Sequence, residues 1–281
     1  MNLTPESLPS VIEDITSSKN GATKNFEEEA FELFIGLLDA GRIRAAEAVG
    51  EEWVVHEWVK KGILLGFKLG MLKAIPAAGP FTFFDKHTYP VKDVALENNI
   101  RIVPGGTSIR RGAYVAPGVI MMPPSYVNVG AYIGEGTLID SHALIGSCAQ
   151  VGKRTHISAA AQIGGVLEPM NALPVVIEDD VLIGGNCGIY EGTVVKKRAV
   201  IAAGVILTGS TPLYDCVNRK IIKKSASGSL IVPSNAVVVA GSRMMTGEFA
   251  RTHRLGIYTP LIVKYRDSAT DARTALEEAL R

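Results

Sequence analysis

An aliphatic residue or Met recurs at every sixth position from Ile109 onward, and no other feature of the 281-residue chain constrains its fold so strongly. The fourth residue after each of these positions is small or β-branched, with Leu167 as the exception. Residues two apart on a strand share a face, so both sets should point inward while the residues between them turn corners. The first register comprises Ile109, Val115, Met121, Val127, Ile133, Ile139, Ile145, Val151, Ile157 and Ile163; the second comprises Ile177, Ile183, Ile189, Val195, Ile201, Leu207 and Leu213, with Val232 and Val238 beyond it.

The corner positions are rich in glycine, which adopts left-handed backbone angles without steric cost. Strands joined by a corner every six residues close into a triangular prism with three six-residue units (hexads) per coil. Such a chain is a parallel β-helix of about six coils. A sandwich, or a sheet with crossover helices, needs turn signals at longer spacing. We therefore predict a mainly β protein in which each coil covers the open edge of the coil before it.

The first hundred residues lack the repeat and show helical periodicity instead. In "FEEEAFELFIGLLDAG", Phe31, Phe34 and Leu38 share one helical face, and Gly41 follows as a stop signal. The predicted organisation is an N-terminal mainly helical cap domain (1–100), a hexapeptide-repeat β-helix (101–265) with loop excursions at 166–176 and 214–231, and a C-terminal helical tail (266–281).

Charge and cysteine usage exclude several classes of partner. Lys and Arg total 29 against 28 Asp and Glu, so no net field attracts nucleic acid or an anionic membrane. Cys148, Cys187 and Cys216 are too few and too widely spaced for a disulfide framework or a zinc site. With no secretion signal and no apolar run of about 20 residues, we expect a soluble cytoplasmic protein.

Asp140 and His142 stand out in "GTLIDSHALIGS", residues 136–147, because the repeat places both at a solvent-facing corner. Asp140 is either a turn-capping carboxylate or a group that takes part in chemistry, and the repeat alone leaves both interpretations open. His142 is expected to be a corner residue or a subunit contact. His156 occupies a different repeat phase, which argues against a three-ligand metal site.

The second excursion concentrates positive charge. Its cations either hold phosphate groups, such as those of coenzyme A, or form a solvated charge run. No glycine-rich loop ending in Lys-Ser or Lys-Thr is present, so nucleotide chemistry of the P-loop type is not indicated. The cations are Arg219, Lys220, Lys223 and Lys224.

Several blocks of the sequence resemble the hexapeptide-repeat acyltransferases, and within them the tetrahydrodipicolinate N-succinyltransferase family. The most specific block is "PSYVNVGAYIGEGTLID", and "EEWVVHEWVKKGILLGF" is similar to the family's N-terminal cap. The resemblance implies a left-handed β-helix, a homotrimer, and active sites between neighbouring subunits. The other matching blocks are "RIVPGG", "IGSCAQVGK", "IGGVLEP", "VIEDDVLIG", "EGTVV", "LYD" and "IVPSNAVVVAGS".

The implied reaction transfers a succinyl group from succinyl-CoA to the amino group of opened tetrahydrodipicolinate, in the diaminopimelate route to lysine. Succinyl-CoA is then a co-substrate, and no tightly bound cofactor or metal is expected. A guanidinium suits a dicarboxylate, a carboxylate can accept the amine's proton, and corner amides can stabilise the thioester oxygen. The family match assigns substrate binding to Arg101 and Asp140, catalysis to Asp140 and Glu191, and CoA binding to Gly165, Ala203, Gly204 and Lys223.

One departure from the family pattern concerns the catalytic carboxylate. In "IGGNCGIYEG", Gly188 stands where the family often has a glutamate proposed to act in catalysis, while Glu191 matches a second family glutamate. Which carboxylate acts as general base is therefore open. No covalent acyl-enzyme is required, so neither Cys148 nor Cys187 is assigned as a nucleophile, and Cys187 should pack inward. Another CoA-dependent N-acyltransferase and a non-catalytic β-helix scaffold remain as alternatives.

Overall fold

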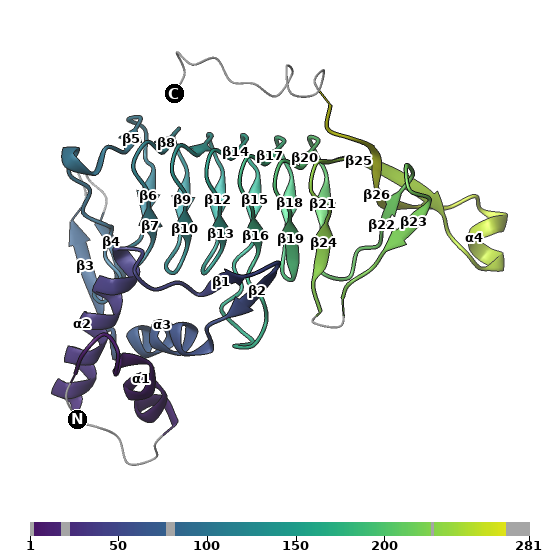
Figure 1. Ribbon diagram of the computed structural model, residues 1–281. Coiled ribbons are helices and arrows are strands. Elements are labelled where there is room, and N and C mark those ends of the chain that lie inside the picture. Colours follow the sequence, from purple (N-terminus) through teal and green to yellow (C-terminus); the bar gives the residue numbers. More distant parts are fainter. Residues whose placement is uncertain (1–2, 18–22, 77–81, 226–227, 268–281) are drawn as a thin grey trace.

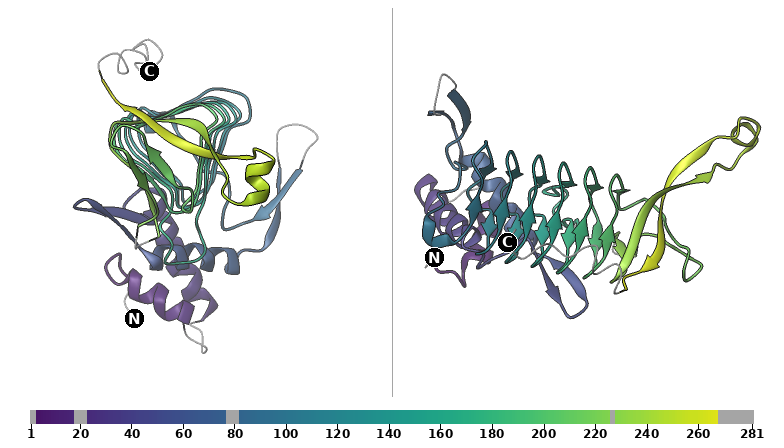
Figure 2. Two further views of the ribbon diagram at one scale, coloured as in Figure 1. Left: turned by 90° about the vertical axis from the view of Figure 1, so that its right-hand side faces the viewer. Right: turned by 90° about the horizontal axis from the view of Figure 1, so that it is seen from above.

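A triangular prism of short parallel strands dominates the computed structural model, which describes residues 3–17, 23–76, 82–225 and 228–267 (Figure 1). Seen along its axis, the chain winds round three flat faces as a left-handed parallel β-helix (Figure 2). Two of the three sheets have six strands each, one per coil, which confirms the six-coil prediction.

We number the three faces of the prism in the order in which the chain visits them. Sheet 1 contains β5 (Arg101–Ile102), β8 (Ile120–Met121), β11 (Leu138–Ile139), β14 (His156–Ile157), β17 (Leu182–Ile183), β20 (Val200–Ile201) and the start of β25 (Ala236–Met244). Sheet 2 contains β6 (Ser108–Ile109), β9 (Tyr126–Val127), β12 (Leu144–Ile145), β15 (Gln162–Ile163), β18 (Gly188–Ile189) and β21 (Ile206–Leu207). Sheet 3 contains β7 (Tyr114–Val115), β10 (Tyr132–Ile133), β13 (Gln150–Val151), β16 (Val176–Ile177), β19 (Thr193–Val195) and β24 (Leu230–Val232). The stacked corners between them form edge 1–2, edge 2–3 and edge 3–1.

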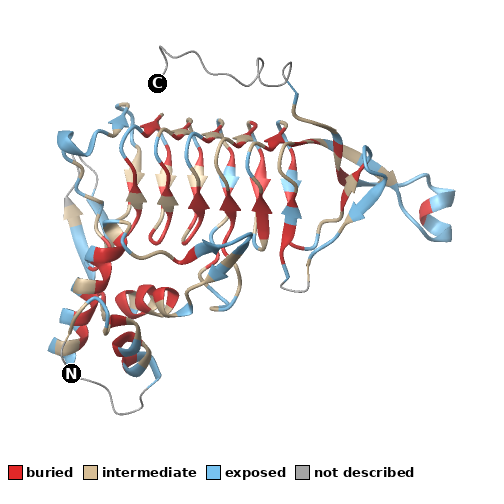
Figure 3. Ribbon diagram, in the orientation of Figure 1, coloured by how far each residue is buried: buried red, intermediate tan, exposed pale blue. Residues whose placement is uncertain are grey.

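The predicted inward residues form the core of the prism. Ile139, Ile145 and Val151, one from each sheet of the same coil, are completely buried. Each such aliphatic side chain contributes about 1.5–3 kcal/mol through burial. Ile139 pairs in register with Ile157 of the next coil, so identical hexad positions stack along the axis. Figure 3 shows this buried lining running through every coil.

The cap packs against one end and one flank of the prism. It contains the predicted helical segment, in which Phe31, Phe34 and Leu38 are buried. The helix at Glu57–Leu69 contains glycines because aromatic rings pack directly against its backbone. A Cβ at Gly62 would lie 2.6 Å from the Phe34 ring. Besides its helices the cap includes two antiparallel hairpins, and the first of them, at residues 46–55, interrupts the stretch with helical periodicity. Its elements are α1 (Leu8–Ser17), α2 (Lys24–Asp39), β1 (Ala46–Val49), β2 (Glu52–Val55), α3 (Glu57–Leu69), β3 (Leu72–Pro76), β4 (Thr82–Lys86) and the 3-10 turn η1 (Leu96–Asn98).

Both predicted excursions leave the prism at edge 2–3. The first connects β15 to β16 and folds onto α3, where the buried Lys60 Nζ donates a hydrogen bond to the Ala172 carbonyl at 2.5 Å. The second connects β21 to β24 and carries the antiparallel pair β22 (Leu213–Asp215) and β23 (Lys220–Ile222). Leu213 is therefore the first residue of the excursion hairpin, although its side chain is buried as the repeat predicted.

The C-terminal end of the repeat differs from a simple continuation of the coils. β25 begins in sheet 1 and then runs outward, paired with β26 (Gly256–Tyr265) in a long hairpin with α4 (Glu248–Thr252) at its tip (Figure 2). The phenol of Tyr258 bonds both to the amide nitrogen and to the carbonyl oxygen of Ile206, on the last strand of sheet 2. The predicted tail helix lies almost wholly outside the described residues. No helix in the described ranges is long and apolar enough to cross a membrane.

Candidate active site

Asp140 lies at edge 1–2, directly after β11, and its side chain is half-buried. Its Oδ1 accepts a hydrogen bond from the Ser141 amide at 2.7 Å, which is the capping contact of a turn residue. Its Oδ2 makes no hydrogen bond with any described residue, so one oxygen fixes the side chain and the other is available to a ligand. The capping and chemical interpretations of Asp140 are thus compatible. His142 is exposed beside it, in the left-handed backbone region.

Arg101 is exposed on the outer face of β5, the first strand of sheet 1. Its guanidinium has no hydrogen-bond or ion-pair partner among the residues that the structure describes. The order β5–β8–β11 places Arg101 and the Asp140 corner two strands apart. That separation is about 10 Å along the prism, which leaves room for a small molecule between a guanidinium and a carboxylate.

Ala203 and Gly204 lie on the same edge as Asp140, three coils further along, and both are exposed. Gly204 has φ +75°, and no atom lies within 4 Å of the place where its Cβ would be. This open corner has backbone that an extended ligand can approach closely. Edge 1–2 therefore holds three of the predicted site residues, in the order Asp140, Ala203, Gly204, and Arg101 lies on the adjoining face of sheet 1.

Gly165 and Glu191 lie on edge 2–3, the edge from which both excursions leave. A Cβ at Gly165 would sit 2.5 Å from the Ser147 amide nitrogen, so the stacking of corners requires glycine here. Glu191 is exposed and lines a cavity of about 410 Å³ between the two excursions. The cavity is lined by Asn171, Ala172 and Leu173 from the first excursion, Lys224, Gly228 and Ser229 from the second, and Glu191, Gly192, Gly209 and Ser210 from the edge itself.

The cations of the second excursion divide into two groups. Arg219 and Lys220 lie at the turn of the β22–β23 hairpin, whereas Lys223 and Lys224 follow β23. All four are exposed, and Lys224 is the one that lines the Glu191 cavity. The family resemblance assigns CoA binding to Lys223, whereas Lys224 is named only as one of the four cations that could hold phosphate groups.

Within one chain, the predicted residues fall on two different edges of the prism. Edge 1–2 holds Asp140, while edge 2–3 holds Gly165 and Glu191, and sheet 2 separates them. The two predicted catalytic carboxylates therefore do not meet in a single copy of the chain. A site that uses both requires an edge from a second copy.

Tyr190 is a further residue of this region that the sequence interpretation did not single out. Its ring lies over Gly188 on the outer face of sheet 2, and its hydroxyl donates to Gln162 Oε1 at 3.0 Å. The available signal was a glycine at an outward strand position with an aromatic residue two places later.

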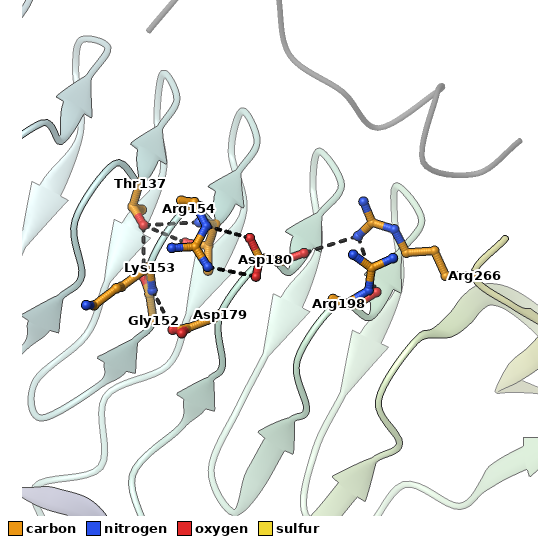
Figure 4. Close-up of polar contacts among 9 residues, drawn as sticks. Thr137, Gly152, Lys153, Arg154, Asp179, Asp180, Arg198 and Arg266 are labelled. Carbon is orange, nitrogen blue, oxygen red and sulfur yellow. Dashed lines mark hydrogen bonds and ion pairs between the residues drawn. The ribbon is translucent and has the colours of Figure 1, made fainter. Parts of the chain in front are cut away.

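Edge 3–1 carries a separate network of charged corners. Arg154 makes a two-pronged ion pair with Asp180 of the next coil, at 2.8 and 2.9 Å (Figure 4). The Asp179 carboxylate accepts the Lys153 amide, and Arg266 donates to the Asp180 carbonyl. These contacts join successive coils.

A cavity of about 370 Å³ lies beside these corners, under the β1–β2 hairpin. Arg44, just before this hairpin, stacks 3.6 Å from the Tyr132 ring centroid.

Cys148 and Cys187 are buried and placed for packing, whereas Cys216 is exposed. Burial raises the pKa of the Cys148 thiol to about 12, and it also raises the pKa of Cys187, whose Sγ donates to the Ala202 carbonyl. The inward packing predicted for Cys187 is confirmed. In the part of the chain that the structure describes, no three His, Cys, Asp or Glu side chains gather as a metal site requires.

Comparison with known proteins identifies the family. Residues 7–69 match the profile of the tetrahydrodipicolinate N-succinyltransferase N-terminal domain, and residues 174–209 match the hexapeptide repeat of succinyl-transferase. The 2,3,4,5-tetrahydropyridine-2,6-dicarboxylate N-succinyltransferase of Cupriavidus taiwanensis is 42% identical over 275 residues, covering 96% of this chain and 94% of that protein. The chain belongs to the tetrahydrodipicolinate N-succinyltransferase family.

A second relative is similar to this chain over nearly as much of its length. The enzyme of the same name from Bordetella parapertussis is 44% identical over 260 residues, covering 90% of this chain and 89% of its own length. A solved Campylobacter jejuni structure, described as a putative 2,3,4,5-tetrahydropyridine-2-carboxylate N-succinyltransferase, is 16% identical, with a TM-score of 0.44 over 88% of this chain and 64% of its own. The identity to family members extends over cap and prism alike.

Proposed function

We propose that this protein transfers the succinyl group of succinyl-CoA to the amino group of opened tetrahydrodipicolinate, giving N-succinyl-2-amino-6-oxopimelate and CoA. The observation that carries this proposal is the identity of 42–44% to enzymes of that name over nine-tenths or more of the chain. The reaction belongs to the diaminopimelate route to lysine.

Arg101 and Asp140 fit the two ends of such a substrate. An unpaired guanidinium binds a carboxylate through two parallel hydrogen bonds, and Arg101 has its guanidinium free for this among the described residues. Asp140 Oδ2, about two strands away, then faces the amine. Because Oδ1 is held by the Ser141 amide, the carboxylate is oriented before the substrate arrives.

The reaction requires no covalent enzyme intermediate. The amine nitrogen attacks the thioester carbonyl carbon, a C–N bond forms, the C–S bond breaks, and CoA leaves as the thiolate. The amine proton passes to Asp140. The backbone amides of Ala203 and Gly165 are the proposed donors along the CoA thioester and chain, with Lys223 near its phosphates. The Gly204 amide donates to the Gly185 carbonyl at 2.9 Å, so Gly204 is proposed to contribute the open backbone of the corner rather than a donor.

We propose further that the active enzyme is a homotrimer in which edge 1–2 of one copy faces edge 2–3 of the next. This arrangement is supported by the separation of Asp140 from Glu191 within one chain. It is also supported by apolar side chains on the outer faces of the prism, such as Leu138, Leu144 and Ile206. Light scattering should give about three times the chain mass of 29.9 kDa.

A cytoplasmic location is consistent with the cysteines. All three are free thiols, and Cys216 is exposed, as expected in a reducing compartment.

A thiol-release assay of the purified protein tests the proposed reaction. Succinyl-CoA with tetrahydrodipicolinate, or with its analogue 2-aminopimelate, should release CoA at a rate proportional to enzyme. Acetyl-CoA and an amino sugar serve as the competing acyl donor and acceptor. Faster turnover with either of these would assign a different N-acyl transfer, and no release with any pairing would leave only a scaffold role.

A further inference from the structure

The outer face of sheet 2 has no room for a side chain at Gly188, because Tyr190 occupies the space. A Cβ built on Gly188 would lie 2.5 Å from Cε2 of the Tyr190 ring and 2.9 Å from its Cζ, and it would also lie 2.9 Å from Cδ1 at the end of the Ile206 side chain. Real Cβ atoms do not approach so closely. The glycine and the tyrosine therefore form one unit, in which the ring replaces whatever Gly188 could have presented.

The Tyr190 hydroxyl is held in a defined place. It donates to Gln162 Oε1 at 3.0 Å, and Gln162 is the register neighbour of Gly188 on the adjacent strand β15. Since the phenol proton is used in this bond, the oxygen keeps its lone pairs for an incoming donor. Gln162 is exposed and Tyr190 half-buried, so these lone pairs are within reach of a ligand.

Tyr190 also lies among the predicted site residues of edge 2–3. A Cβ at Gly164, next to Gly165, would lie 3.1 Å from the tyrosine Cδ1, and Glu191 follows Tyr190 directly in the chain. The ring thus lies between the corner assigned to the CoA chain and the carboxylate that lines the excursion cavity.

We propose that Tyr190 positions the attacking amine of the dicarboxylate substrate. Its hydroxyl oxygen accepts one N–H of the amine, while another N–H proton passes to Asp140 of the facing copy as the amide bond forms. Gln162 fixes the hydroxyl, and no bond to Tyr190 is made or broken. The inference rests on the proposed function and on the proposed pairing of edges.

Tyr190→Phe is the direct test, because it removes the hydroxyl and keeps the ring packed on Gly188. We expect kcat to fall about tenfold, the scale of one lost hydrogen bond made in the transition state. The KM for succinyl-CoA and the melting temperature should stay at the wild-type values. Tyr126→Phe is the matched control: Tyr126 is on the same face three coils away, with its hydroxyl 3.4 Å from Asn128 Oδ1.

A rescue experiment separates positioning from packing. Gly188→Glu alone should displace the ring and lower kcat, whereas Gly188→Glu combined with Tyr190→Val should recover much of it, because a carboxylate then accepts the amine N–H. The double variant should also add a second ionisation to the acidic limb of its pH–rate profile, because both Asp140 and the new carboxylate must then be ionised, whereas in Tyr190→Phe the only carboxylate proposed to contact the amine is Asp140.

The possible outcomes separate this inference from the proposed function. Active wild type with an equally active Tyr190→Phe would overturn the role of Tyr190 alone. Equal losses in Tyr190→Phe and Tyr126→Phe would assign both hydroxyls to packing. A wild-type protein that releases no CoA from any donor would remove the proposed function, and this inference with it.

Discussion

Replacing Asp140 by asparagine removes one chemical property of the side chain while keeping its shape. The amide oxygen of asparagine can still accept the Ser141 amide, which Asp140 Oδ1 now accepts at 2.7 Å. The Asp140 Oδ2 position becomes an NH2 group, which donates hydrogen bonds and cannot take a proton. The exchange therefore tests the carboxylate as proton acceptor without disturbing the corner.

The exchange of Asp140 for asparagine should affect stability and catalysis by very different amounts. Keeping the Ser141 contact should hold the loss in unfolding free energy below about 1 kcal/mol, the net value of one hydrogen bond. Losing a general base should lower kcat by about 10²- to 10⁴-fold, or roughly 2.7–5.5 kcal/mol in activation free energy. Activity should thus fall by far more than stability.

Thiol-release kinetics and thermal melts on the same samples measure both effects. Asp140→Ala provides the comparison, because it also deletes the Ser141 contact and should melt earlier than Asp140→Asn. If Asp140→Asn turned over within threefold of wild type, the carboxylate would be only a turn cap, and the proton would have to leave by another route.

Four further outcomes follow from the structure. Arg101→Lys should raise the KM for the dicarboxylate at least tenfold, since a lysine cannot form the two-pronged bond, while the KM for succinyl-CoA should change little. A variant whose KM for the dicarboxylate equals that of the wild type would contradict the role of Arg101. At pH 8, iodoacetamide should label Cys216 and leave Cys148 unmodified, because burial that raises the Cys148 pKa to about 12 keeps this thiol protonated, as mass spectrometry can check. Gly134→Ala should lower the unfolding free energy by about 1–3 kcal/mol through overpacking, as its Cβ would lie 2.6 Å from the Gly152 carbonyl carbon. Gly204→Ala should cost about 1–2 kcal/mol from its φ of +75° alone, and a larger loss in a urea titration would show a contact that the single chain lacks.

The repeat made the prism predictable, because a period of six leaves few alternatives for where each side chain points. Ile139 and Cys187 are buried as their hexad positions required. The same periodicity failed where the chain leaves the coils. Leu213 keeps the register in sequence but begins the β22–β23 hairpin, in which the chain turns at 216–219 and returns so that Ile222 pairs with Leu213.

The positions of the candidate site residues in the fold were predictable from the repeat, whereas their detailed contacts were not. Hexad phase placed Asp140 at a corner, but the contact of its Oδ1 with the Ser141 amide depends on side-chain rotamer. Tyr190 was missed because a corner position predicts an outward side chain, whereas its ring folds back over Gly188. The Tyr190 ring can fold back because Gly188 has no side chain there. The space above Gly188 is evident only once neighbouring strands are stacked in the structure.

Because the coils are stacked at a constant spacing, distances along the prism axis come in fixed steps. Arg101 and the Asp140 corner are separated by two strands of sheet 1, so their spacing is a whole number of steps of about 4.8 Å. Inserting or deleting an entire 18-residue coil between them would preserve the register of every other strand, yet lengthen or shorten the accepted molecule by one step. Finer adjustment has to come from side chains at the corners. If Arg101 and Asp140 have the roles proposed for them, coil number sets the length class of the substrate and corner residues select within it.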